Sequence, residues 1–299
     1  IHQYFEFPKQ NLMAVGLGGG HSGFTVATMH LMNPNNARQL IYVDTSKPEA
    51  DGSDGAGFFR QSWASQLLEL QKFAQKGSDE KIRFATVEGT IPSADELEAW
   101  GTTLFIGVGH ETTGANTYSE SEIEQLLAWL ERDPDNRHAV LDATSMLGAM
   151  PWGEIIVQNV LTKCCLFMPF QKAIGGISGY FIVSFTPQAL RLVESNQNDP
   201  AWAIPRQLKL APPVDAKLPI SGKRSVTMGP FYDAMQDRMI GGVINTYSAL
   251  AFAETTFGLL KAAQRVGSVG QLNLRSVQNR QVIRDWIEKS SLLRFVVKE

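Results

Sequence analysis

The sequence predicts an α/β fold in which a mostly parallel sheet is covered by helices on both faces. Short apolar runs of strand length alternate along the chain with longer stretches whose apolar residues recur at helical spacing. This alternation is typical of strand–helix–strand units, whose parallel strands are buried between helices. The chain has 299 residues, of which 43% are hydrophobic and 19% charged, so it can form the core of one large domain or of two smaller ones.

The N-terminal part predicts a strand, a tight turn and a helix. Residues 11–16 are an apolar run that stops at the glycine cluster of residues 16–20. Residues 24–32 have helical periodicity, and an Asn-Pro pair ends this helix. The apolar run at residues 40–44 then predicts a second buried strand.

The middle of the chain continues the alternation. Residues 51–57 are rich in glycine and aspartate and predict a loop, and residues 65–75 have the spacing of a helix. Strands are expected at residues 82–87 and 103–108. Ser119 and Glu122 then form a capping box, which predicts the start of an amphipathic helix that runs to about residue 131.

Three further apolar runs, at residues 138–142, 164–168 and 180–184, predict the remaining strands. Residues 196–242 are rich in proline and glycine and lack periodicity, so we expect an irregular excursion there. Helical periodicity returns in two C-terminal stretches, residues 246–260 and 272–288.

The composition argues against several classes of function. The chain has 27 Lys+Arg against 30 Asp+Glu, and this balance gives no basic surface for nucleic acid. No run approaches the roughly 18 apolar residues of a membrane span, and no signal pattern opens the chain, so we expect a soluble, cytoplasmic protein. The adjacent Cys164 and Cys165 favour buried positions on a strand over a disulfide or a metal site. The histidines show no metal-ligand spacing either, so no metal is expected.

The glycine-rich turn supports three interpretations. Gly18, Gly20 and Gly23 have the G-x-G-x-x-G spacing between a predicted strand and a predicted helix. Asp44 ends the next strand 44 − 23 = 21 residues later, as in an NAD-binding Rossmann fold. Glycines also let backbone amides approach any phosphate ester at the positive end of a helix. The third interpretation is a turn that binds nothing.

Asp142 and Lys172 indicate a more specific chemistry. Asp142 ends one apolar run and Lys172 follows another. In a parallel sheet both would emerge at the carboxyl edge, where ligands bind. A lysine can form a Schiff base with the aldehyde of pyridoxal phosphate (PLP), and a carboxylate can keep the pyridine nitrogen protonated. The pair, 172 − 142 = 30 residues apart, therefore favours a PLP site.

Six segments resemble the class V aminotransferases, and most closely the phosphoserine aminotransferase group among them. These segments occur in the family's order and are GGGHSGF at residues 18–24, SWA at 62–64, HET at 110–112, DATS at 142–145, FQK at 170–172 and NT at 245–246. The resemblance implies the PLP-dependent transferase fold of type I, a mostly parallel sheet between helices.

The resemblance also implies roles for single residues. Lys172 would form the Schiff base and then move the proton between the substrate α-carbon and the cofactor, and Asp142 would pair with the pyridinium. Trp63 would stack on the ring face. Thr112 would bind the phenolic oxygen, with the neighbouring Thr113 as the alternative.

The phosphate of PLP would be held from both subunits of a homodimer. The resemblance implies that Gly20 and His21 offer backbone amides and Gln171 its side-chain amide. Asn245 and Thr246 would reach the same phosphate from the partner subunit.

The activity implied is a transaminase that exchanges the amino group between phosphoserine and 2-oxoglutarate. Alanine–glyoxylate or serine–pyruvate transamination is the close alternative. An NAD-dependent oxidoreductase that uses the loop at residues 18–23, or a homologue without cofactor, are alternatives from other classes.

The resemblance further implies a large PLP-binding domain at residues 1–260 and the start of a small C-terminal domain at residues 261–299. The rest of that small domain, with the family's basic residues for the substrate carboxylate and phosphate, is not found, so it is expected to be only partly represented. The family's His-Arg-Ser segment before the glycine turn is not found either. Substrate choice is therefore the least specific part of the interpretation.

Overall fold

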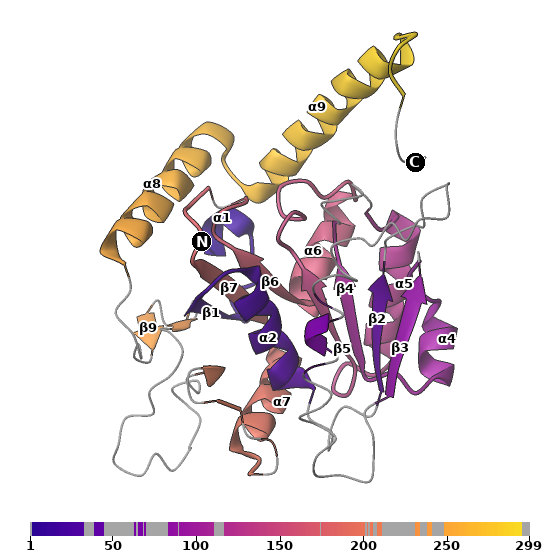
Figure 1. Ribbon diagram of the computed structural model, residues 1–299, viewed down its shortest axis with the longest axis vertical. Coiled ribbons are helices and arrows are strands. Elements are labelled where there is room, and N and C mark those ends of the chain that lie inside the picture. Colours follow the sequence, from indigo (N-terminus) through magenta and orange to yellow (C-terminus); the bar gives the residue numbers. More distant parts are fainter. Residues whose placement is uncertain are drawn as a thin grey trace.

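The computed structural model describes most of the predicted α/β core. The described residues are 2–32, 39–44, 63, 65–67, 69, 83–88, 90–110, 117–173, 175–200, 202, 204–205, 208–210, 231–233, 238–240 and 248–294. Within these ranges, strands β1 to β9 form one sheet (Figure 1). The predicted fold class is therefore confirmed.

The strands follow one another across the sheet in the order β3-β2-β4-β5-β6-β7-β1-β8-β9. Their bounds are β1 Leu12–Leu17, β2 Gln39–Asp44, β3 Arg83–Glu88, β4 Leu104–Val108, β5 His138–Asp142, β6 Cys165–Pro169, β7 Tyr180–Phe185, β8 Phe231–Asp233 and β9 Arg238–Ile240. Neighbours from β3 to β6 pair in parallel, whereas β7 pairs antiparallel with both β6 and β1. Since β8 and β9 also pair antiparallel, only β7 and β8 run against the other described strands.

Helices cover both faces of the sheet. Figure 1 shows α2 and α7 on one face and α4, α5 and α6 on the other. The bounds of the helices are α1 His2–Phe5, α2 Gly20–Leu31, α4 Ala94–Ala99, α5 Glu120–Arg132, α6 Glu154–Lys163, α7 Pro187–Asn198, α8 Ala249–Val266 and α9 Val269–Glu288. None of the helices within the described ranges combines the length and the hydrophobicity needed to cross a membrane.

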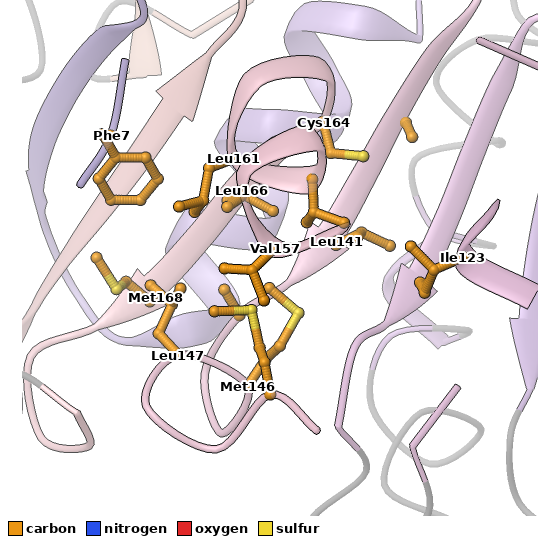
Figure 2. Packing of buried hydrophobic residues seen from close by; sticks show 14 of the residues in the cluster. Phe7, Ile123, Leu141, Met146, Leu147, Val157, Leu161, Cys164, Leu166 and Met168 are labelled. Carbon is orange, nitrogen blue, oxygen red and sulfur yellow. The ribbon is translucent and has the colours of Figure 1, made fainter. Parts of the chain in front are cut away.

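Strand β5 sends alternate side chains into two separate cores. On β5, Leu141 packs in the core beneath α5 and α6, while Val140 packs in the core beneath α2 and α7. Figure 2 shows the first core, where Val157 and Leu161 of α6 lie over Leu166 and Met168 of β6. The same alternation directs the side chain of Asp142 toward the α2 face, which becomes the face of the candidate site.

Several elements differ from the sequence prediction. The helix expected at residues 24–32 begins at Gly20, because the glycine cluster already forms its first turn. The helices α4, α6 and α7 were not predicted, and the short strands β8 and β9 lie within the stretch expected to be irregular. Cys165 lies on β6 as expected, but Cys164 is the residue after α6 rather than part of the strand.

The two C-terminal helices lie outside the layers of the sheet. α8 and α9 form an arm, and α9 extends away from the rest of the described chain (Figure 1). The base of the arm is fixed by hydrogen bonds: the Gly270 amide donates to Glu6 at 3.1 Å, and the Met150 amide donates to Asn273 Oδ1 at 3.1 Å. The predicted domain boundary at residue 260 falls within α8, and this division stays a prediction.

Candidate active site

Asp142 is the centre of the candidate site. It is the last residue of β5, and its side chain is only 4% exposed. The backbone amide of Thr144 donates to Oδ1 at 2.8 Å, and the indole N–H of Trp63 donates to Oδ2 at 2.8 Å. Burial raises the pKa of this carboxyl group above its ordinary value, although the hydrogen bonds from Thr144 and Trp63 oppose the shift. A buried carboxylate whose ionised form is disfavoured is suited to pair with a cation.

Trp63 closes one side of Asp142. Its indole is 2% exposed and stacks on Phe24, with 4.7 Å between ring centroids and 16° between planes. The His21 ring lies 4.8 Å from it in a tilted arrangement. The predicted stacking of Trp63 on a cofactor ring would therefore require the indole to leave these neighbours.

The glycine turn reaches the same edge of the sheet. Gly18 has a φ of +113°, which only glycine adopts readily, and its amide donates to Gly179 at 2.7 Å. A Cβ atom placed on Gly20 would lie 3.6 Å from both Thr144 Oγ1 and the Trp63 ring. The next nearest atom would be Pro169 Cδ, at 3.9 Å. Gly20 thus leaves open a small concave space between the start of α2 and the ends of β5 and β6.

The first turn of α2 can bind an anion there. The first amides of a helix have no acceptor within the helix, and its N-terminus carries a partial positive charge. Gly19, the residue that precedes α2, has no side chain to cap those amides. The backbone amides of Gly20 and His21, which the sequence predicts as phosphate ligands, are therefore at the positive end of α2.

Lys172 lies in the turn after β6. The register pairs Asp142 with Phe167, so Lys172 follows five residues beyond the partner of Asp142 at the same edge. Gln171 and Lys172 are both exposed. The turn is fixed by backbone hydrogen bonds, from Gly175 to the Lys172 carbonyl at 2.9 Å and from Phe170 to the Tyr180 carbonyl at 3.0 Å.

The structure therefore brings Gly20, His21, Trp63 and Asp142 into contact or near contact, with Lys172 on the adjacent turn. Thr112, Thr113, Asn245 and Thr246 lie outside the described residues, so their predicted roles stay predictions. Thr144, which sequence reasoning quoted only as part of a motif, contacts both Asp142 and the space beside Gly20. The sequence signal for Thr144 was its position two residues after Asp142, the end of the predicted strand.

The strand order argues against the NAD interpretation. In a Rossmann fold the glycine turn and the ribose-binding acid follow neighbouring strands. Here β4, β5, β6 and β7 stand between β2 and β1. Five strand spacings of about 4.8 Å put the end of β2, at Asp44, about 24 Å from the end of β1.

Neither a metal-binding cluster nor a reactive cysteine is found within the described ranges. No cluster of three or more His, Cys, Asp or Glu side chains that could hold a metal occurs among these residues. Cys164 and Cys165 are both buried, and burial raises the pKa of Cys165 to about 12, so its reactive thiolate form is not populated at neutral pH.

Comparison with known proteins supports the aminotransferase resemblance. No family profile matches the sequence. The phosphoserine aminotransferase of Methanosarcina mazei is 25% identical over 244 residues, which are 80% of this chain and 54% of that protein. The chain thus spans about half the length of this curated relative.

Solved structures show the same fold. An alanine–glyoxylate aminotransferase from Nostoc sp. superimposes with a TM-score of 0.61 at 14% identity, over 96% of this chain and 62% of the other. A PLP-bound phosphoserine aminotransferase from Trichomonas vaginalis gives a TM-score of 0.55 at 14% identity, over 97% and 63%. The chain has the fold of these aminotransferases, and the resemblance predicted from the sequence is confirmed.

Proposed function

We propose that the chain binds PLP at the carboxyl edge of β5 and β6 and forms the cofactor-binding part of an aminotransferase. The observation that carries this proposal is the convergence of three features on one edge of the sheet. These features are the anion-binding start of α2, the buried carboxylate of Asp142 and the turn with Lys172. When bound, PLP supplies an aldehyde that condenses with amines and a ring that accepts electrons from the substrate.

The described residues fit this cofactor. Asp142 is buried, and no lysine or arginine of the described residues forms an ion pair with it, so a protonated pyridine nitrogen would supply the missing cation. The space beside Gly20, which a Cβ atom would narrow, lies at the positive end of α2 and suits a phosphate.

Lys172 would hold the aldehyde carbon through its Nζ atom. Its exposure leaves the amine accessible to both cofactor and substrate. Once substrate takes its place, the same Nζ would accept a proton from the substrate α-carbon and return it. His21 and Trp63 would line the cofactor side of the pocket, and Gln171 would add its amide to the phosphate.

The substrates follow from the relatives rather than from the described residues. We infer phosphoserine and 2-oxoglutarate as the amino donor and acceptor, because the curated relative is named a phosphoserine aminotransferase. The alanine–glyoxylate type is the alternative, because a protein of that name shares the fold. In either case Asn245 and Thr246 of a second subunit would complete the phosphate site, so a homodimer is part of the proposal.

The proposal is tested by absorbance. Purified protein incubated with PLP should develop a near-visible band that borohydride reduction removes, and Lys172→Ala should lack this band while keeping its fold. Lys163→Ala is the matched control, because Lys163 lies at the opposite edge of the sheet and pairs with Glu131. If Lys172→Ala forms the band, or if the unmodified chain never does, the proposal is wrong. If the unmodified chain forms the band, a screen of single amino acids for loss of the band would identify the amino donor.

A further inference from the structure

The turn between β6 and β7, which carries Lys172, packs against the first half of α8. Three aromatic rings form this contact: Phe170, which follows β6, Tyr180 at the start of β7, and Phe252 of α8. The centroid of the Phe252 ring lies 5.2 Å from that of Tyr180 and 6.3 Å from that of Phe170, edge to face in both pairs. Phe170 and Tyr180 are almost fully buried, so these rings anchor α8 to the base of the turn.

A hydrogen bond joins the start of α8 to the same turn. The backbone amide of Ser248, the residue that caps α8, donates to Tyr180 Oη at 2.5 Å. The backbone of Tyr180 closes the turn, because its carbonyl accepts from the Phe170 amide at 3.0 Å. Tyr180 therefore binds α8 through its side chain and the base of the turn through its backbone.

Gly176 allows α8 to approach the turn closely. A Cβ atom on Gly176 would lie 2.4 Å from Thr255 Oγ1, far inside van der Waals contact, and Thr255 is a buried residue in the second turn of α8. The Gly176 amide donates to the Phe170 carbonyl at 2.9 Å, and the adjacent Gly175 amide donates to the Lys172 carbonyl at 2.9 Å. Thr255 therefore packs directly on backbone that is hydrogen-bonded to both ends of the segment that holds Lys172.

We propose that Tyr180 and Thr255 position Lys172 for reaction with the aldehyde of PLP, because they hold its turn against α8. Lys172 is exposed, so packing does little to restrain its side chain, and the reach of Nζ is set by the backbone of the turn. Reacting atoms must approach within about 3–3.5 Å, so a turn that shifts slows the reaction. Both residues act through this backbone, which makes them positioning residues. The inference rests on the proposed function and deepens it, since it assigns α8, outside the layers of the sheet, to the active site.

Gly176→Ala tests the contact with Thr255 by a clash and its relief. The added methyl group should push the turn away from α8, and Thr255→Ala in the same chain should relieve the clash by removing Oγ1. Amide hydrogen exchange of the peptide at residues 171–179 measures this without any cofactor. Exchange should be about tenfold faster in Gly176→Ala and should fall back toward that of the unmodified chain in the double variant. Gly107→Ala is the matched control, because its Cβ would lie 2.6 Å from Tyr118 Oη but belongs to β4.

Tyr180→Phe tests the effect on Lys172. The substitution keeps the ring in the aromatic contact but removes the acceptor of the Ser248 amide. After mixing with PLP, the near-visible band should form about tenfold more slowly than in the unmodified chain, and Gly176→Ala should behave alike. Pyridoxamine phosphate has no aldehyde and cannot condense with Lys172, so its affinity, measured by calorimetry, should stay within about twofold. Tyr4→Phe is the matched control, because Tyr4 is also buried and its hydroxyl forms no hydrogen bond among the described residues.

The outcomes separate this inference from the proposed function. The inference is overturned if the turn exchanges equally fast in all variants, if Thr255→Ala does not relieve Gly176→Ala, or if pyridoxamine phosphate binding weakens as much as band formation slows. In each of these cases the unmodified chain still forms its band, so the proposed function stands. An unmodified chain that never forms the band refutes the proposed function, and the positioning role of Tyr180 and Thr255 fails with it.

Discussion

The hydrogen bond between Trp63 and Asp142 makes a specific prediction for Trp63→Phe. The substitution keeps an aromatic ring against Phe24 but removes the N–H that donates to Asp142 Oδ2 at 2.8 Å. Both residues are at least 96% buried, so water does not replace the lost donor readily. A hydrogen bond to a charged group contributes about 1.5–3 kcal/mol. We therefore expect the variant without cofactor to lose about 2 kcal/mol through this bond alone.

Trp129→Phe is the matched control. Trp129 is also fully buried, but its indole N–H makes no hydrogen bond within the described part of the chain. Both substitutions remove the same ring atoms, so the difference between them isolates the bond to Asp142. At about 2–4 °C per kcal/mol, the melting temperature of Trp63→Phe should lie about 4–8 °C below that of the control.

The same variant reports on the proposed cofactor. If the Trp63 indole moves to stack on the cofactor ring, as the sequence predicts, it leaves Asp142 Oδ2 and this hydrogen bond is lost, whereas a variant that lacks the bond binds without that loss. Since 1.4 kcal/mol is a factor of ten, a bond of about 2 kcal/mol predicts PLP affinity at least tenfold tighter in Trp63→Phe. Equal melting temperatures for the two variants, or weaker PLP binding by Trp63→Phe, would refute this reasoning.

Three further predictions follow from burial and backbone geometry. Because burial raises the pKa of Asp142, its contribution to stability is present below the ordinary carboxyl pKa and is lost as pH rises through the raised value. The melting temperature should therefore fall with rising pH over this range, and Asp142→Asn should remove that fall. Gly20→Ala should fold normally, since its Cβ meets no atom closer than 3.6 Å, yet it should lose the preference for PLP over unphosphorylated pyridoxal. Gly18→Ala should instead lower the melting temperature, because Gly18 has a φ of +113°. Burial lowers the pKa of His30 from 6.5 to about 4, so about 3 kcal/mol of stability present above pH 6.5 should be lost on acidification to pH 4. The melting temperature of His30→Gln should fall less on acidification than that of the unmodified chain, and an unchanged pH profile would contradict this.

The sequence was most informative where hydrophobicity and spacing act locally. The strand at His138–Asp142 and the capping box at Ser119 and Glu122 are observed as predicted. The helix α6 was missed because its β-branched residues Ile155, Ile156, Val157 and Val160 favour a strand by propensity. The helix buries Ile156, Val157 and Val160 in the core, and this tertiary packing cannot be seen in the local sequence.

Other misses had a signal in the sequence. Ser93 and Glu96 form a second capping box at α4, and Thr186 followed by Pro187 is a typical start for α7. The antiparallel direction of β7 could be predicted too, because only ten residues separate it from β6, fewer than a parallel crossover requires. The hydrogen bond from Trp63 to Asp142 has no such signal, since it joins residues 79 positions apart through tertiary packing.

The antiparallel β7 explains how the candidate site is held in place. Because β6 and β7 form a hairpin, the turn with Lys172 is fixed at both ends by strands instead of leading into a crossover helix. The Gly18 amide donates to the Gly179 carbonyl in that same connection, at 2.7 Å, so the glycine turn is bonded to it directly. The Ala143 amide donates to the Phe167 carbonyl at 2.9 Å and fixes the end of β5 against β6.

The backbones that position an anion at α2, a carboxylate at Asp142 and an amine at Lys172 are therefore joined by hydrogen bonds to one hairpin. Such a framework sets the relative positions of the three groups before any ligand binds, which lowers the ordering cost of binding. The side chains of Trp63 and Lys172 then become the parts that must move, because the backbone beneath them is already fixed. A cofactor that binds this edge should accordingly change the environment of Trp63 while leaving the strand register intact, and tryptophan fluorescence with amide hydrogen exchange on β5 and β6 can measure both.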